Sequence, residues 1–371
     1  MIFNLEPAPG RNRAAHVSSA AAAAGTRLAR PYEGCKLRLF TSYWWALLAP
    51  IVLAALTPQT LAQTCLSAGD MDVTTRTALE NAGRRYFEMA GRGDVVSLRQ
   101  NAIPSLAADF SGVENAVRDN QAIFAGAQGT PRPPFELQEP GAASSQRAEF
   151  FCGVFGASGQ TANSAVFVIS NLAPGNYGIV IVDVPTSKGA YTLSFVLQQV
   201  GGDWKLGGFY ARPAQVAGHD SNWFIQRARE FKSKGQIHNA WFYYREAGEL
   251  MAAVPFMSTL ATDKLYDEAQ AAQPTDLPIT GPVDLAGAGG KTYKLTTIFP
   301  LAVGNDLDIV VKYQYPDVSN TAQTFQDNIA VIKALVAKYP ELREGFAGVV
   351  ARAVEPSGRD YGTLLPMKDV K

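Results

Sequence analysis

The chain has 371 residues, of which 47% are hydrophobic and 18% charged, and its 33 basic residues balance 33 acidic ones. This length favours two or three domains, and the composition is typical of a globular protein with enough apolar residues to form cores. A formal net charge of zero excludes the strong positive potential on which nucleic-acid binding depends. We therefore expect several folded domains and no nucleic-acid partner.

Residues 1–63 have the features of an export signal. They hold six basic and two acidic residues, which leaves 27 basic and 31 acidic residues, a net charge of −4, in the remainder. An apolar run over residues 43–56 is shorter than the roughly 20 residues of a transmembrane helix, and small residues lead from it to a predicted cleavage site near residues 62–63. The region before the run is longer than a signal needs, which a start codon assigned upstream of the true one would explain.

The expected location is therefore periplasmic or extracellular, in a bacterial envelope. An uncleaved N-terminal membrane anchor is the alternative. Lipidation at Cys65 would be a second route to the membrane, but Thr64 stands where a lipoprotein signal has Gly, Ala or Ser.

Two cysteines remain once the signal is removed, Cys65 and Cys152, because Cys35 leaves with residues 1–63. In an oxidising compartment such a pair predicts a disulfide. A reactive thiol pair is the alternative, and it lacks both a C-x-x-C spacing and a basic neighbour that would lower a thiol pKa. We expect a Cys65–Cys152 bond that anchors the start of the mature chain.

Segment 64–215 begins with helices and continues with strands. Apolar residues three to four apart predict a helix from residue 72 to the glycines of 91–94, and a second helix over 113–124. Alternation and turn residues then predict six strands, over residues 135–139, 148–155, 165–170, 177–184, 190–200 and 204–211. The tripeptide GGD at 201–203 predicts a hairpin between the last two strands. Within each of these strands alternation predicts one shared face, made by Tyr191, Leu193, Phe195 and Leu197 in the first, and by Trp204, Leu206, Gly208 and Tyr210 in the second.

Helices followed by antiparallel strands that end in YTLSFVLQQVGGDWKLGGFYARP resemble the NTF2-like, or cystatin-like, α+β cone over residues 72–213. The resemblance implies helices packed inside a curled sheet, with a cavity. Some members of that family are isomerases or dehydratases that use a pocket Asp, Tyr or His. Tyr86 and Asp109 lie in the helical half, but no motif gives either residue a role. For residues 165–184 a small β-sandwich is the structural alternative.

Residues 216–273 are expected to form a helical hairpin. Asp220 or Ser221 can cap a helix that begins at Trp223, and Gly235 separates it from a second helix. The apolar stripes are Phe224, Ala228 and Phe231, then Ile237, Ala240, Trp241, Tyr244, Ala247, Gly248 and Met251. The pattern resembles one tetratricopeptide-type hairpin, with Arg227 where that repeat favours an apolar residue. A single copy cannot build the groove of a repeat array, so we expect its stripe to be buried against a neighbouring domain.

Candidate binding residues gather in this hairpin: His219, Asp220, Trp223, His238, Trp241 and Tyr244. A carboxylate can orient an imidazole, so His219 and Asp220 could act as an acid–base pair, although Asp220 serves better as a helix cap. We expect His238 to be solvated and the aromatic residues to pack in a core, with an aromatic pocket as the alternative. Two histidines after the signal are too few for a histidine-rich metal site. We predict no catalytic residues, no metal and no cofactor.

Residues 274–371 are expected to form a small two-layer domain after a linker, AAQPTDLPITGP. The glycine-rich AGAGGKT at 286–292 lacks the first glycine of a phosphate loop and is expected to be a turn. Strands are predicted over 291–299 and 307–315, then a helix capped by Ser319 or Asn320, then strands over 347–354 and 361–366. The apolar stripe of that helix is Phe325, Ile329, Ile332, Val336 and Tyr339. The whole chain is thus expected to be α+β.

These features predict an exported envelope protein that binds a small ligand or a protein partner, without catalysis, through the cavity of segment 64–215 and the aromatic hairpin. One alternative is an isomerase, lyase or hydrolase that works in the cone. The other is a structural component of an envelope assembly, in which the domains serve as interfaces and the protein forms an oligomer.

Overall fold

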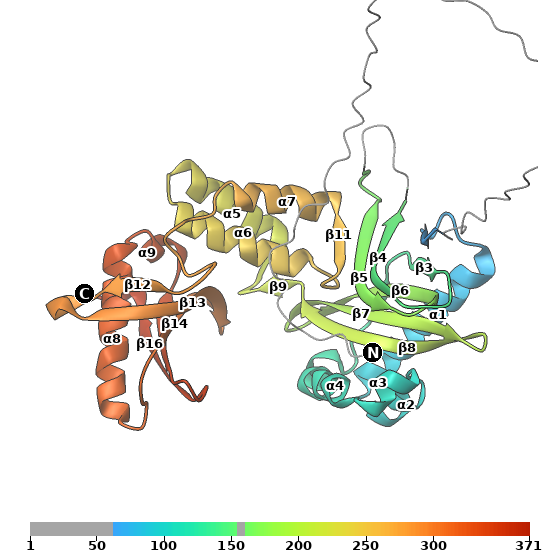
Figure 1. The fold of residues 1–371 in the computed structure, drawn as a ribbon, viewed down its shortest axis with the longest axis horizontal. Helices are drawn as coiled ribbons and strands as arrows, with labels where there is room; N and C mark the ends of the chain where they lie inside the picture. Colours follow the sequence, from blue (N-terminus) through green and yellow to red (C-terminus); the bar gives the residue numbers. More distant parts are fainter. Residues whose placement is uncertain (1–61, 154–159) are drawn as a thin grey trace, which may run out of the picture. The chain divides into compact units, whose positions relative to one another are not determined.

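The computed structural model describes residues 62–153 and 160–371 (Figure 1). The predicted export signal, residues 1–63, lies almost entirely outside this range. Helices and sheets, mainly antiparallel, share the described residues, so the fold class is α+β as predicted. In that range, no helix combines the length and apolar character needed to cross a membrane.

Helices fill the beginning of segment 64–215 and strands fill the rest. The helices are α1 (Val73–Gly91), α2 (Val95–Gln100), α3 (Pro104–Ala108) and α4 (Ser111–Phe124). The strands are β1 (Thr64–Leu66), β2 (Thr130–Pro131), β3 (Phe135–Glu139), β4 (Ser145–Cys152), β5 (Ala165–Leu172), β6 (Gly175–Thr186), β7 (Gly189–Val200) and β8 (Asp203–Pro213). All six predicted strands are present, with bounds that differ by a few residues.

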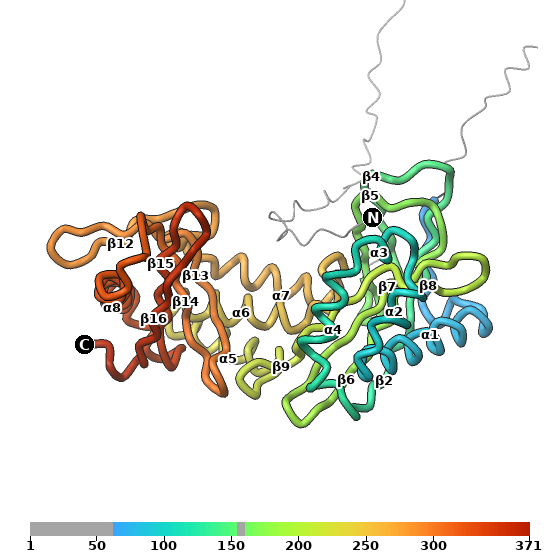
Figure 2. The backbone as a smooth tube through the Cα atoms, turned by 90° about the horizontal axis from the view of Figure 1, so that it is seen from below, coloured from blue at the N-terminus to red at the C-terminus, as the bar shows by residue number. Residues whose placement is uncertain are grey.

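The main sheet has the order β1-β3-β6-β7-β8, with β2 paired to β6, and all its pairs are antiparallel. One face packs on helices α1 to α4, as Figures 1 and 2 show. Alternate residues of β6 and β7, such as Val180, Val182 and Phe195, enter that core with Leu79 and Tyr86 of α1. Every second residue of these strands therefore faces the helices.

The opposite face of the main sheet is buried as well. A three-stranded sheet of β4, β5 and β11 (Met257–Thr259) lies against it, and the rings of Phe135 on β3 and Phe167 on β5 are 5.3 Å apart. Ile179 and Ile181 of β6 are at most 2% exposed on this side. Burial on both faces explains why β6 is an almost continuous apolar run. Segment 64–215 thus combines a helix layer with a second sheet, and its resemblance to NTF2-like domains stays a prediction.

A bulge in β8 changes one predicted face. Val196 pairs with Gly208 but Leu197 pairs with Leu206, so Gly207 is an extra residue in β8. Each side chain after the bulge moves to the other face. Trp204 and Leu206 therefore belong to the core on the helix side, whereas the Tyr210 ring contacts Phe256, 6.0 Å away. The prediction that Tyr210 shares a face with Trp204 is wrong for this reason.

Cys65 and Cys152 form the predicted disulfide, with Cα atoms 5.0 Å apart and a sequence separation of 87. Cys65 lies on β1 of the main sheet and Cys152 ends β4 of the small sheet. The bond therefore links the two sheets at the start of the described chain. In the chain-entropy description, closing a loop of this length stabilises the fold by about 4–5 kcal/mol.

Segment 216–273 contains the predicted hairpin and a third helix. Its elements are β9 (Gln215–Val216), β10 (His219–Asp220), α5 (Ser221–Ser233), α6 (Ile237–Met251) and α7 (Leu260–Gln270), with β11 between α6 and α7. Gly235 has φ of 76°, a left-handed conformation that glycine adopts without strain, and it makes the turn between α5 and α6. The stripe of Phe224, Ala228 and Phe231 is fully buried. Ile237, predicted to start the second stripe, is instead 43% exposed.

The C-terminal segment has the predicted strand–strand–helix–strand–strand order with one added edge strand. Its elements are β12 (Val283–Ala286), η1 (Ala288–Gly290), β13 (Thr292–Val303), β14 (Asp306–Gln314), α8 (Thr321–Lys338), α9 (Leu342–Gly345), β15 (Gly348–Val354), β16 (Asp360–Pro366) and η2 (Met367–Asp369). The sheet order is β12-β13-β14-β15-β16, and only β14 and β15 are parallel, because α8 returns the chain between them. Helix α8 packs on β15 and β16.

The buried face of α8 is polar in its first half, which differs from the predicted stripe. Phe325 is 40% exposed, whereas Thr324 and Asn328 are fully buried. The hydroxyl of Tyr313 donates to Asn328 Oδ1 at 2.8 Å, and Asn328 Nδ2 donates to Thr363 Oγ1 at 2.9 Å. These bonds satisfy the buried Asn328 amide. Polar residues that would usually face solvent can therefore be buried on this side of α8.

A single hydrophobic core runs from Phe224 on α5 to Val370 near the C-terminus. The aromatic stripe of the hairpin is therefore buried against the C-terminal segment, as expected for a lone hairpin. Four consecutive residues of α6, from Trp241 to Tyr244, are at most 5% exposed, because α6 lies among α5, α7 and the C-terminal segment.

Candidate functional site

Asp220 acts as a helix cap. Its Oδ1 accepts the backbone N–H of Trp223 at 2.9 Å, at the start of α5. The imidazole of His219 instead stacks on the Trp223 indole, with ring centroids 3.6 Å apart and planes 7° from parallel. The Asp220 carboxylate thus caps the helix, and the His219 imidazole packs on an indole ring. This arrangement does not support an acid–base pair of the two residues.

The aromatic candidates pack in the core, as expected by default. Trp241 is 5% and Tyr244 is 1% exposed. Trp223 is partly buried against Tyr243, with centroids 5.9 Å apart. None of these rings lines the pocket described below.

The expectation that His238 is solvated is wrong. Its side chain is 12% exposed, its Nδ1 lies 2.5 Å from Glu341 Oε1, and its Nε2 lies 2.9 Å from Asp276 Oδ1. The ring also packs on Tyr339, with centroids 4.5 Å apart. Carboxylates only accept, so both contacts are hydrogen bonds when both ring nitrogens carry hydrogen. His238 thereby joins α6 to the linker and to the turn after α8.

The Asp276 carboxyl responds to this contact. Burial raises its pKa, but the hydrogen bond and the charge of His238, together with smaller contributions from the Asp276 backbone and Lys338, hold the pKa below its ordinary value. Removing the imidazole would leave two carboxylates facing the same space. We therefore regard His238, Asp276 and Glu341 as a clasp that holds α6 to the C-terminal segment.

Side chains fill the space between α1–α4 and the main sheet. Tyr86 is fully buried there, and its hydroxyl lies 2.9 Å from the Trp204 carbonyl and 3.1 Å from the Asn101 carbonyl. Asp109 is exposed and accepts a bond from the Ser111 hydroxyl at 3.1 Å. These two residues therefore do not form a pair of titratable groups inside the helix layer.

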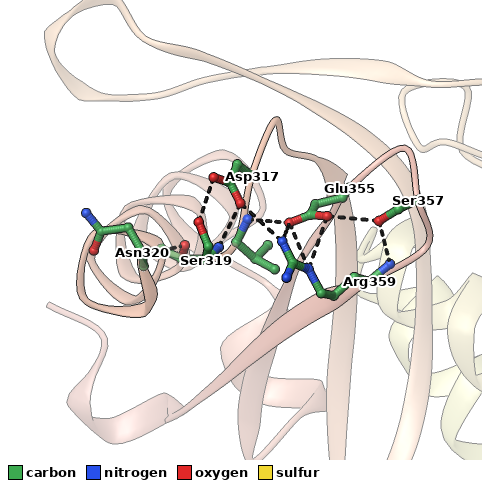
Figure 3. Close-up of polar contacts among 8 residues, drawn as sticks. Asp317, Ser319, Asn320, Glu355, Ser357 and Arg359 are labelled. Carbon is green, nitrogen blue, oxygen red and sulfur yellow. Dashed lines mark hydrogen bonds and ion pairs between the residues drawn. The ribbon is translucent and has the colours of Figure 1, made fainter.

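A dense polar cluster lies at the start of α8, as Figure 3 shows. Glu355 accepts the backbone N–H of Val318 at 2.6 Å, and Arg359 binds both of its oxygens. The bond from Arg359, followed by that from Val318, lowers the pKa of Glu355 to about 2. Asn320 caps α8 through the N–H of Gln323. Each contact stays within this cluster, so its role is to fix the start of α8.

A pocket of about 320 Å³ lies where the main sheet meets the α5–α7 segment. We call it the junction pocket. It is lined by Arg132, Thr192, Ala214, Ser221, Leu250, Met251, Ala253, Met257, Thr259 and Thr262. Its volume is within the range of small-molecule sites.

One hydroxyl in the junction pocket lacks a partner. Thr192 on β7 is 5% exposed, and no hydrogen bond of its hydroxyl is found among the described residues. The hydroxyl is not one of the fully buried side-chain atoms that lack a partner, so it is accessible from the pocket. By contrast, Thr259 and Thr262 bond to one another in a capping box at the start of α7. An accessible hydroxyl that no protein group bonds is available to a ligand or to water.

Charged groups beside the pocket occur in pairs. Arg132 binds Asp183 through two bonds of 2.9 and 2.6 Å, and Arg212 binds Glu249 at 3.1 Å. Asp183, Thr192 and Arg212 are register partners across β6, β7 and β8, so they form one row on the sheet.

Sequence reasoning did not find this pocket, because its walls come from segments between residues 132 and 262 that share no motif. One local signal existed. Thr192 and Ser194 interrupt the apolar strand AYTLSFVL on the face opposite to Leu193 and Phe195. A polar pair on a buried strand face indicates a bonded or a binding position. Ser194 proves to be bonded, to the Ala253 carbonyl at 3.0 Å.

Within residues 62–153 and 160–371, no group of three or more His, Cys, Asp or Glu side chains is arranged to hold a metal ion. Comparison of the chain with protein-family models, with curated proteins and with solved structures finds no match.

Proposed function

We propose that the chain is an exported bacterial envelope protein that binds a small ligand in the junction pocket, without catalysis. The observation that carries the proposal is the pocket itself, with Thr192 in its wall and the hydroxyl of that residue bonded to no described group. The lining offers hydroxyls, one paired guanidinium and apolar side chains, which suit recognition. His219 and His238, the histidines that could act in acid–base chemistry, are engaged elsewhere.

Export is supported by the disulfide, since such bonds persist in oxidising compartments. The same proposal includes an NTF2-like assignment for residues 64–215, supported by helices packed on an antiparallel sheet. It also includes a tetratricopeptide-like assignment for α5 and α6, supported by their paired stripes.

The test is native mass spectrometry of the protein purified from the extracytoplasmic fraction, compared with its denatured mass. We expect a small mass that is lost on denaturation. Ala214→Phe places a ring into the pocket and should abolish the extra mass. Ala302→Phe makes the same change at an exposed position of β13 and should retain it.

Retention of the mass by both variants would place the ligand elsewhere and overturn the proposal. A clean apo protein that forms a stable oligomer would favour the structural alternative instead.

A further inference from the structure

We infer that the ligand of the junction pocket is an uncharged molecule that carries an amide or hydroxyl group beside a hydrocarbon part. The inference rests on the proposed function, because it names the class of ligand for the same pocket. Three properties of the pocket and its surroundings support it: paired charges, occupied helix termini, and a lining that combines an unbonded hydroxyl with apolar side chains.

The charges at the pocket are already matched. The Arg132 guanidinium meets the Asp183 carboxylate with two bonds of 2.9 and 2.6 Å, the two-bond geometry in which this pair is strongest. Arg212 is bonded to Glu249 through a single bond of 3.1 Å. Both pairs are exposed, with side-chain exposures of 45% and 48% for Arg132 and Asp183, so each charge is already offset by its partner and screened by water. They leave no unpaired charge at the pocket to attract a charged ligand.

The two helix ends at the pocket are also occupied. Ser221 begins α5, and Thr259 and Thr262 begin α7, so both positive helix ends border the cavity. Such ends attract anions when their N–H groups are free. Here the Asp220 carboxylate caps α5, while α7 has its capping box and an acidic residue in its first turn. The helix ends therefore leave little attraction for a ligand anion.

Hydroxyl and hydrocarbon groups remain for the ligand. Thr192, 5% exposed, presents a hydroxyl that no described residue bonds. A hydroxyl can both donate and accept, so it pairs with an amide or an alcohol equally well. The lining also includes Leu250, Met251 and Met257, and methionine adapts its shape to apolar ligands. The complement of this lining is a neutral polar group attached to an aliphatic chain.

The experiment compares three probes with one carbon skeleton: hexanamide, hexanoate and hexylammonium. Binding to the mature, disulfide-bonded protein is measured by ligand-observed NMR titration at pH 7. We expect hexanamide to bind at least about tenfold more tightly than either charged probe, because a charged probe loses hydration in the pocket and finds no unpaired charge there.

Variants locate the contact. Thr192→Val keeps the β-branched shape and removes the hydroxyl, so hexanamide affinity should fall about three- to tenfold. Thr297→Val, the same change at an exposed position of β13, should leave it unchanged. Thr192→Ser keeps the hydroxyl and should bind like the natural protein, which provides a second reading if the valine variant folds poorly.

Tighter binding of hexanoate or hexylammonium than of hexanamide would overturn the inference while leaving the pocket as a binding site. Hexanamide binding that is lost in Ala214→Phe but unchanged in Thr192→Val would also overturn it, because water alone would then satisfy that hydroxyl. If none of the three probes binds, the inference is rejected. The native-mass experiment then decides separately whether the pocket holds any ligand.

Discussion

Glu246 on α6 provides the sharpest test of how burial controls this fold. Burial raises the pKa of its carboxyl to about 7, the nearby carboxylate of Glu249 adds to the rise, and the Arg245 guanidinium opposes it. The ordinary value is 4.5. Between these two values the folded protein holds a proton that the unfolded chain releases. We therefore expect the variant Glu246→Gln, which copies the neutral form, to change how stability depends on pH.

The direction and size follow from linkage. A carboxyl with a raised folded-state pKa stabilises the fold below pH 4.5 relative to higher pH, and that advantage disappears as the pH rises to about 7. Each pKa unit corresponds to 1.36 kcal/mol, so the difference amounts to about 3 kcal/mol. The natural protein and Glu246→Gln should be equally stable near pH 4. At about pH 8 the variant should be more stable by about 3 kcal/mol.

The assay is urea denaturation between about pH 4 and 8, followed by tryptophan fluorescence, with the disulfide intact. Trp223 and Trp241 lie on α5 and α6 and report on the segment that contains Glu246. Glu88→Gln is the control, because that glutamate on α1 is 63% exposed. It should change stability by less than about 0.5 kcal/mol at any pH. If Glu246→Gln followed the pH dependence of the natural protein, Glu246 would ionise normally when folded, and the reasoning from burial would be wrong.

Four further outcomes are expected. His238→Ala should lower the unfolding free energy by about 2 kcal/mol, because Asp276 and Glu341 lose their shared donor, and an unchanged urea midpoint would dismiss the clasp. Cys152→Ser should cost about 4–5 kcal/mol in thermal or urea unfolding, and two free thiols found in the natural protein by non-reducing mass spectrometry would reject the bond. Gly83→Ala should destabilise by about 1–3 kcal/mol because the added Cβ would lie 2.4 Å from Val180 Cγ1, while Gly112→Ala on α4, with open space around it, should be neutral or stabilising. N-terminal sequencing of the exported protein should begin near Gln63, and a chain that begins at Met1 would contradict cleavage.

Sequence patterns correctly predicted the helices, strands and turns that depend on neighbouring residues in the chain. The hairpin of β7 and β8 follows from period-2 alternation around GGD, and the α5–α6 turn follows from Gly235. Strands β1 and β11 were missed because each has three residues, and each exists only through pairing with a strand far away in the sequence. No periodicity can appear in three residues.

Wrong predictions of which side chains are buried have a different cause. Phe325 was placed inward because apolar side chains usually are buried, yet α8 turns Thr324 and Asn328 inward. Their burial is satisfied by Tyr313 and Thr363, which lie on β14 and β16. His238 was predicted to be solvated because it lies off the apolar stripe of its helix. Its partners, Asp276 and Glu341, lie 38 and 103 residues away in the sequence. Polar residues in a core are paired through tertiary structure, and the sequence spacing of one helix does not contain that information.

The junction pocket owes its shape to one short connection. Residues 253–259 bond to the N-terminal sheets through Ser194 and the Ala253 carbonyl, through Val168 and the Phe256 carbonyl at 2.9 Å, and through the β5–β11 ladder. The helices on either side of this connection, α6 and α7, belong to the core shared with the C-terminal segment. A ligand in the pocket would therefore contact both parts of the protein at once. Because it would bind only when these parts are joined, its binding free energy would add to the stability of the junction.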